Sequence, residues 1–140
     1  MAQQGTRRVL TTHDGLQHCV SVLEPHGHRV AIDCPYTGKG EEFSPTNLVE
    51  GALAGCMLLA MGTLAMRNEI DLKGTEVEVK IDYEEGPVMR YGAIEVIFRM
   101  AQNFDQKDRM RLERAADSCP IKHSFHDGVK ITVNYQYPGD

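Results

Sequence analysis

The chain lacks the features that mark several large classes of protein. Its 140 residues contain no tryptophan, no internal repeat and no low-complexity segment. The 15 Lys and Arg residues form no long run and the formal net charge is −5, which argues against a general nucleic-acid binder. Residues 1–8 are polar, so we expect no signal peptide or transit segment. We therefore expect a cytoplasmic protein that binds neither nucleic acid nor membranes.

Common catalytic and metal-binding motifs are missing as well. There is no Cys-x2-Cys pair, no glycine-rich phosphate loop, no nucleophile-elbow serine and no carboxylate pair placed for acid–base catalysis. Cys119, His123 and His126 cluster, but their spacing matches none of the usual zinc patterns. We expect no bound metal. In a reducing cytosol the four cysteines are expected to be free thiols and not structural disulfides.

What the chain does contain is one long apolar segment, residues 44–67. Ser44 is a good N-cap, Pro45 suits the first helical position, and no residue from Gly51 to Met66 is charged. This uncharged part is shorter than the ~18 residues of a membrane span, so a buried helix is predicted. A helix that is apolar on all sides is hard to cover with 140 residues, and its small residues permit close approach of another helix. We predict an intimate homodimer; the alternative is a monomer in which the small residues face a sheet.

Around this helix the hydrophobic pattern predicts strands and one further helix. The second helix begins near Asn103 or Asp105 and is stopped by Pro120. The order of elements predicts an α+β fold in which antiparallel sheet covers a central helix, as a single domain over residues 1–140. Alternating apolar and polar residues predict strands at residues 7–12, 18–23, 28–33, 75–83, 94–100 and 129–137.

The cysteines divide between the predicted helices and strands. Cys56 lies in an apolar stripe of the long helix, where a lone cysteine is usually a small core residue; reactivity would require a cation from another element or a partner chain. Cys119 is predicted in the last turn of the second helix, where the helix dipole disfavours a thiolate. It is therefore the better resolving thiol and the poorer attacking one. Cys19 and Cys34 are expected to be structural.

Two motifs resemble the OsmC/Ohr family, and its OsmC-like branch in particular. The first is GKGEEFSPTNL at residues 38–48, followed by ALAGCM at residues 52–57. The second is SCPI at residues 118–121, after the second helix. The resemblance implies an OsmC-like fold, with antiparallel sheets wrapped around long central helices in an intertwined homodimer.

The same resemblance implies a thiol peroxidase that reduces organic hydroperoxides and hydrogen peroxide in oxidative-stress defence. Cys56 would be the peroxidatic nucleophile, and Cys119 would capture its sulfenic acid as a disulfide. An external dithiol such as a lipoyl group would reduce that disulfide, without a metal or an organic cofactor. The alternative is a non-catalytic dimeric module that binds a small molecule in the interface pocket.

One part of the family pattern is absent from this sequence. In the family that this chain resembles, strongly active members carry a Glu at the third helix position and an Arg that pairs with it. Here the third and fourth positions are Thr46 and Asn47. Among the acidic residues that could supply the charge, Glu42 is our candidate, beside Glu41 and Glu50. For the cation our first choice is Arg29 and our second is Arg8.

Overall fold

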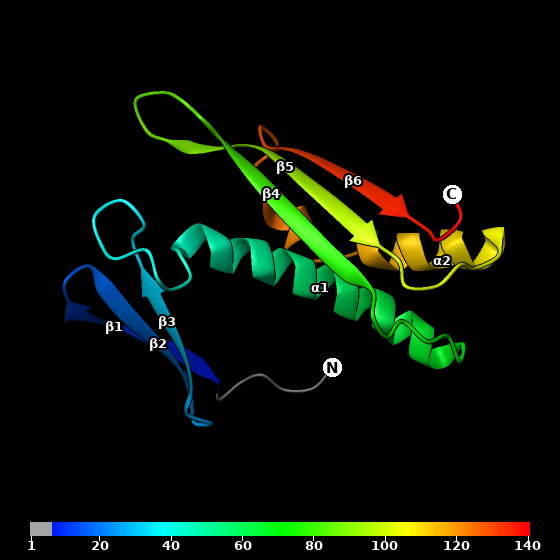
Figure 1. Ribbon diagram of the computed structural model, residues 1–140, viewed down its shortest axis with the longest axis horizontal. Coiled ribbons are helices and arrows are strands. Elements are labelled where there is room, and N and C mark those ends of the chain that lie inside the picture. Colours follow the sequence, from blue (N-terminus) through cyan, green and yellow to red (C-terminus); the bar gives the residue numbers. More distant parts are fainter. Residues whose placement is uncertain (1–6) are drawn as a thin grey trace. The chain divides into compact units, whose positions relative to one another are not determined.

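The computed structural model describes residues 7–140 and divides the chain into two compact units, Met1–Leu48 and Val49–Asp140. Each unit is described below by itself. The order of elements matches the order predicted from the sequence (Figure 1). The elements are β1 (Arg8–Gly15), β2 (His18–Glu24), β3 (His28–Asp33), α1 (Pro45–Arg67), β4 (Glu76–Glu84), β5 (Arg90–Arg99), α2 (Gln106–Asp117), the short 3-10 helix η1 (Lys122–Ser124) and β6 (Lys130–Gln136).

The N-terminal unit is a three-stranded antiparallel sheet in the order β1-β2-β3. The tight turn between β2 and β3 is closed by Gly27, whose φ of 79° favours glycine and whose N–H donates to the Leu23 carbonyl at 2.7 Å. Beyond β3 the chain forms a loop that returns to the sheet. Ile32 pairs with Phe43 in an isolated bridge, and the Asp33 N–H donates to the Phe43 carbonyl at 3.1 Å. The loop is thereby held at its base.

Helix α1 begins where the sequence predicts, because Ser44 and Asn47 cap each other. The Ser44 hydroxyl accepts the Asn47 backbone N–H at 3.1 Å, and the Asn47 side-chain oxygen accepts the Ser44 N–H at 3.1 Å. Pro45 takes the first helical position, where its missing N–H costs no intrahelical bond. The helix then runs for 23 residues to Arg67.

The C-terminal unit covers only one side of α1. Four residues spaced by four are buried, whereas Leu59 is 75% and Met66 is 84% exposed. An added Cβ at Gly55 or Gly62 would meet no atom of the C-terminal unit within 4 Å. By length and composition alone α1 could cross a membrane, but the core helix of a folded protein passes the same test. The buried stripe is Leu53, Met57, Met61 and Ala65.

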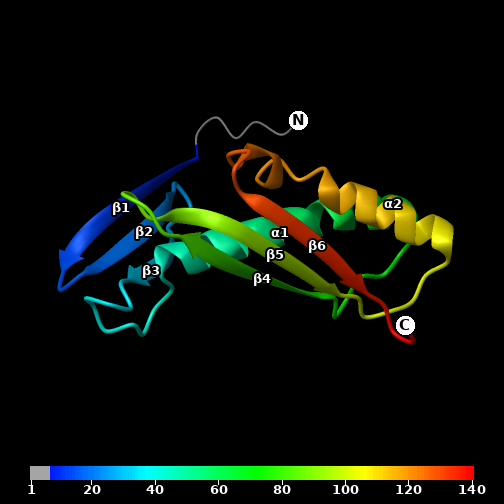
Figure 2. The same ribbon diagram turned by 90° about the horizontal axis from the view of Figure 1, so that it is seen from above.

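The sheet of the C-terminal unit has the order β4-β5-β6 and lies against α1 and α2 (Figure 2). The β4–β5 pair is the predicted antiparallel hairpin. The β5–β6 pair is parallel, with Ile94 opposite Ile131, so the prediction of an antiparallel sheet is wrong for this strand. The reason is the connection, because α2 carries the chain back across the sheet and β6 then runs in the same direction as β5.

Helix α2 is capped by Asp105, whose carboxylate accepts the Asp108 N–H at 2.8 Å. The helix ends at Asp117, so Cys119 lies just beyond α2 and not in its last turn as predicted. Leu112 and Ala116 bury the inner face of the helix in the core of the unit. That core is formed by buried residues of both helices, of the sheet and of the segments that follow them, namely Leu53, Met57, Met61, Ala65, Ile94, Val96, Phe98, Met100, Leu112, Ala116, Cys119 and Tyr137.

Candidate functional site

Cys56 lies at the border between the covered and the uncovered sides of α1. At 3.6 residues per turn it is about 60° from Leu53, which is buried, and about 60° from Leu59, which is exposed. Its thiol is half-buried and packs against the core of the C-terminal unit. The position of Cys56 on α1 therefore puts its sulfur in contact with apolar side chains and leaves it partly accessible from the open side of the helix.

Cys119 is fully buried, and the segment after α2 fixes its position. The Ser118 N–H and hydroxyl both donate to the Ala115 carbonyl, at 3.2 and 2.6 Å, which ends the helix immediately before Cys119. The Lys122 backbone N–H donates to the Cys119 sulfur at 3.4 Å. The sulfur is thus held by main-chain geometry, in addition to its burial in the core.

The two thiols interact directly. Burial is the largest cause that raises the pKa of Cys119, and a hydrogen bond with the Cys56 thiol raises this pKa further. The Lys122 N–H acts in the opposite direction and is the smaller effect. Both cysteines are free. The arrangement keeps Cys119 protonated beside Cys56, where a sulfur–sulfur bond can form between two elements that are distant in sequence.

Lys122 is a site residue that the sequence reasoning missed. Its backbone N–H donates to the Cys119 sulfur, and its side chain, 17% exposed, places the ammonium group 2.6 Å from the Asp117 carboxylate. The signal available in the sequence was its spacing of three residues from Cys119, across Pro120, which is the spacing of a turn. Lys122 therefore anchors the segment that carries the buried thiol.

The predicted activating residues lie in the N-terminal unit. Arg29 is an exposed residue of β3, paired in register with Val22. Arg8, on β1, forms an exposed ion pair with Glu24 at 2.9 Å. Glu42 lies in the loop after β3 and lines a cavity of that unit. Their roles beside Cys56 stay predictions. Within residues 7–140 no group of three or more His, Cys, Asp or Glu side chains is arranged to hold a metal ion.

The sequence range that contains both thiols matches a known protein family. The family model described as OsmC-like protein matches residues 38–134, which include Cys56 and Cys119. The chain belongs to the OsmC-like family. The match also includes Glu42, but Arg29 and Arg8 lie before it. The resemblance seen in the two sequence motifs is therefore confirmed.

Solved structures of OsmC-like and related proteins have the same fold. A protein of Psychrobacter arcticus 273-4, provisionally described as an osmotic stress induced and detoxification response protein, is 29% identical, with a TM-score of 0.87 over 97% of this chain and 100% of that one. The organic hydroperoxide resistance protein OsmC of Legionella pneumophila is 16% identical, with a TM-score of 0.72 over 96% and 98% of the two chains. OhrB of Bacillus subtilis, also an organic hydroperoxide resistance protein, is 16% identical, with a TM-score of 0.69 over 94% and 98%. No curated protein sequence matches this OsmC-like chain significantly.

Proposed function

We propose that this OsmC-like protein reduces organic hydroperoxides, and hydrogen peroxide, at the expense of an external dithiol, as part of oxidative-stress defence in the cytoplasm. The observation that carries the proposal is the interacting pair of thiols, Cys56 and Cys119, in one apolar core. Family membership supports it. So does the likeness to two proteins named for organic hydroperoxide resistance, although at 16% identity these define only the fold.

The proposed reaction begins at Cys56. Its thiolate attacks one oxygen of the hydroperoxide, the O–O bond breaks, and the departing alkoxide takes up a proton and leaves as the alcohol. Cys56 is then a sulfenic acid. The Cys119 sulfur attacks the Cys56 sulfur, a disulfide forms, and the sulfenic hydroxyl leaves as water. An external dithiol such as a lipoyl group reduces this disulfide by thiol–disulfide exchange and is itself oxidised.

The different surroundings of the two sulfurs support this division of roles. Cys119 is buried and its raised pKa keeps it as a thiol, so it stays unreactive toward peroxide until the sulfenic acid forms next to it. Cys56 is the half-buried thiol and borders the open side of α1. The activating cation and carboxylate are proposed to be Arg29 and Glu42, the residues chosen from the sequence; α1 itself carries no acidic residue in its first turn.

A second copy of the chain is proposed to cover the open side of α1. Leu59 and Met66 are the most exposed apolar side chains of the helix, and Gly51, Gly55 and Gly62 leave space for another backbone. A patch of this kind on a helix favours association with a complementary surface. A homodimer would enclose the approach to Cys56 and exclude water from the reaction.

The test of this function compares two cysteine substitutions. Purified protein is expected to consume cumene hydroperoxide with dihydrolipoamide as reductant, and Cys56→Ser should lower the rate by about three orders of magnitude or more, since the nucleophile is lost. Cys34→Ser, a matched change in the other unit, should retain the activity. Hydroperoxide consumption that survives Cys56→Ser would refute the assignment.

A second candidate function is a non-catalytic module that binds an apolar or thiol-containing small molecule. Two observations favour it: the absence of an acidic residue from the first turn of α1, and a cavity of about 380 Å³ beside the end of that helix. The cavity is lined mainly by apolar residues, among them Leu59, Met66, Ile70 and Leu72. Saturable binding of a thiol ligand without any hydroperoxide turnover would favour this function over the enzyme.

A further inference from the structure

A second thiol environment lies in the N-terminal unit, in the turn that follows β3. Cys34 begins this turn, and its carbonyl accepts the Gly38 N–H at 2.8 Å. The Thr37 hydroxyl, then the backbone N–H groups of Thr37 and Tyr36, donate hydrogen bonds to the sulfur and lower the pKa of Cys34. The Gln17 side-chain amide donates to the Thr37 hydroxyl at 2.9 Å, which leaves the hydroxyl hydrogen available for the sulfur. The sequence predicted only a structural role for Cys34, whose sulfur receives these donors.

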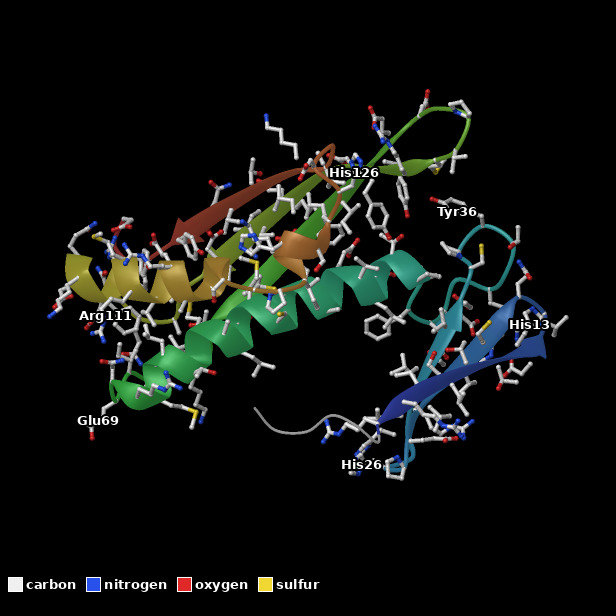
Figure 3. The ribbon with its side chains drawn as sticks, turned by 180° about the vertical axis from the view of Figure 1, so that it is seen from behind. His13, His26, Tyr36, Glu69, Arg111 and His126 are labelled. Atoms are coloured by element: carbon white, nitrogen blue, oxygen red, sulfur yellow. The ribbon has the colours of Figure 1, made fainter. Side chains whose placement is uncertain are left out.

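Cys34 opens onto a small cavity of about 140 Å³ that also contains a second cysteine and a histidine. His13 is paired in register with Cys19, and Cys19 with Ile32, so these three side chains share one face of the sheet. The His13 Nδ1 accepts the Gly15 N–H at 3.2 Å, so the Nε2 carries the proton of the neutral ring. Figure 3 labels His13 and, at the top of the turn, the exposed Tyr36.

Asp33, the neighbour of Cys34, indicates which charge a ligand in this cavity would carry. Its side chain is 5% exposed and lines the same cavity as Cys34. One carboxylate oxygen accepts the Glu41 N–H at 3.0 Å, but the other is buried and has no hydrogen-bond partner within residues 7–140. A buried carboxylate oxygen without a donor is costly. A rotation of the Asp33 side chain toward the cavity would let the N–H donor of a ligand remove that cost.

The surrounding charges favour a cation. Asp33 also lines an adjoining cavity of about 290 Å³, together with Asp14, Glu41, Glu42, Lys39 and His18, whose Nδ1 lies 2.7 Å from the Asp14 carboxylate. The carboxylates outnumber the lysine, so the local field attracts positively charged molecules and repels anions. Because no group of three or more His, Cys, Asp or Glu side chains in residues 7–140 is arranged to hold a metal ion, an organic ammonium group suits this site better.

We propose that Cys34 is a site of S-thiolation, at which a small disulfide carrying ammonium groups exchanges with the Cys34 thiol and leaves one aminothiol half bound in the cavity beside Asp33. The Cys34 thiolate attacks one sulfur of the disulfide, a new S–S bond forms, and the old S–S bond breaks. The second half leaves as a thiolate and is protonated by solvent. Cys34 is oxidised, and the disulfide supplies the oxidising equivalent.

A mixed disulfide is favoured over an internal Cys19–Cys34 bond by geometry. Cys19 is opposite Ile32, and Cys34 follows two residues later, just after the end of β3; if the chain continued in sheet geometry, this position would be a diagonal neighbour of Cys19, about 7–8 Å away between Cα atoms. A disulfide usually requires Cα atoms about 4.4–6.8 Å apart. The second cysteine therefore lines the cavity without being placed to resolve the adduct.

The experiment uses the full chain with Cys56→Ser and Cys119→Ser, so that the proposed peroxidase chemistry does not enter the result. This variant is treated separately with cystamine, which is cationic, with bis(2-hydroxyethyl) disulfide, which is neutral, and with 3,3′-dithiodipropionate, which is anionic. Mass spectrometry of the peptides that contain Cys19 and Cys34 follows each adduct over time. The parent chain, mapped in the same way at all four cysteines, serves as a second measurement if the double variant does not fold.

The expected result is an adduct at Cys34 and a free Cys19, with cystamine fastest and dithiodipropionate slowest. At low ionic strength the two charged reagents should differ by on the order of tenfold, and added salt should reduce the difference. Asp33→Asn, which retains an acceptor for the Glu41 N–H, should bring the three rates closer together. Equal rates for the three reagents, an adduct that forms first at Cys19, or an internal Cys19–Cys34 disulfide would each overturn the proposal.

Discussion

The two units of the chain each hold two cysteines, and the surroundings of the sulfur differ between them. In the C-terminal unit, Cys119 is fully buried in the core and hydrogen-bonded to the Cys56 thiol. In the N-terminal unit, Cys34 lies half-exposed in a turn, and its sulfur is surrounded by hydrogen-bond donors. The pKa of Cys119 is raised mainly by burial, and the pKa of Cys34 is lowered mainly by the Thr37 hydroxyl.

This difference shows that the chemistry of a cysteine follows from the groups around its sulfur and not from its secondary structure. A thiol in an apolar core stays protonated until a reaction partner forms beside it. A thiol at the start of a turn is available as a thiolate at a lower pH. The two sites therefore suit different steps of thiol chemistry, and each has cysteines of its own that can be substituted separately.

The first prediction for peroxide turnover removes Cys119, the buried thiol of the C-terminal unit. Cys119→Ser should lower steady-state peroxide turnover by at least about tenfold, because the Cys56 sulfenic acid then waits for an external thiol and is exposed to further oxidation. The first turnover should remain. Stopped-flow consumption of hydroperoxide measures both phases, and mass spectrometry identifies sulfinic acid at Cys56. Unchanged steady-state turnover would remove Cys119 from the mechanism.

A charge on the open side of α1 should weaken the proposed dimer around Cys56 and leave the Cys34 thiol unchanged. Leu59→Glu places a carboxylate in the proposed dimer interface, and a buried unpaired charge costs about 3–5 kcal/mol. This cost corresponds to dimer dissociation constants on the order of a hundredfold to several thousandfold higher. Analytical ultracentrifugation measures the change, with Leu59→Met as the control. A chain that is monomeric before any substitution would contradict the proposed interface.

A third prediction compares the pH at which the two thiols ionise. Because the pKa of Cys34 is lowered and that of Cys119 is raised, the Cys34 thiolate should appear below the ordinary cysteine range and the Cys119 thiolate above it. The ultraviolet absorbance of the thiolate, measured as the difference between the parent protein and each Cys→Ser variant, gives the two midpoints. The comparison fails if the order of the midpoints is reversed.

The smallest expected effect is that of a single hydrogen bond at Cys34. Thr37→Val removes the hydroxyl that contributes most to lowering the pKa of Cys34, so the thiolate midpoint should rise and thiolation should slow. Thr37→Ser keeps the hydroxyl and should behave like the parent protein. The Cys119 midpoint serves as an internal control, since it should be the same in all three chains. A midpoint of Cys34 that does not move in the valine variant would exclude the hydroxyl as the cause.

Local signals in the sequence predicted most of the fold. Ser44 and Asn47 cap α1, and Asp105 caps α2, because short side chains at these positions satisfy N–H groups that every helix leaves free. The alternation of apolar residues located all of the strands to within a few residues. The two motifs that contain Cys56 and Cys119 identified the family, since they combine residue types and spacing along the chain.

What the sequence could not predict depends on contacts between distant segments. The parallel direction of β6 follows from the path of the chain after α2, and hydrophobic alternation is the same in either direction. The hydrogen bond between Cys56 and Cys119 and the exact end of α2 likewise come from packing.

The four cysteines show which properties follow from the sequence and which follow from the tertiary structure. By itself the sequence determined where the four thiols lie along the chain and which two belong to the family motifs. Only the tertiary structure decided that Cys119 is buried against Cys56 and that the Cys34 sulfur receives donors from Thr37 and Tyr36. The physical reason is that the pKa of a thiol depends on burial and on hydrogen-bond donors within a few ångströms, and folding brings these together.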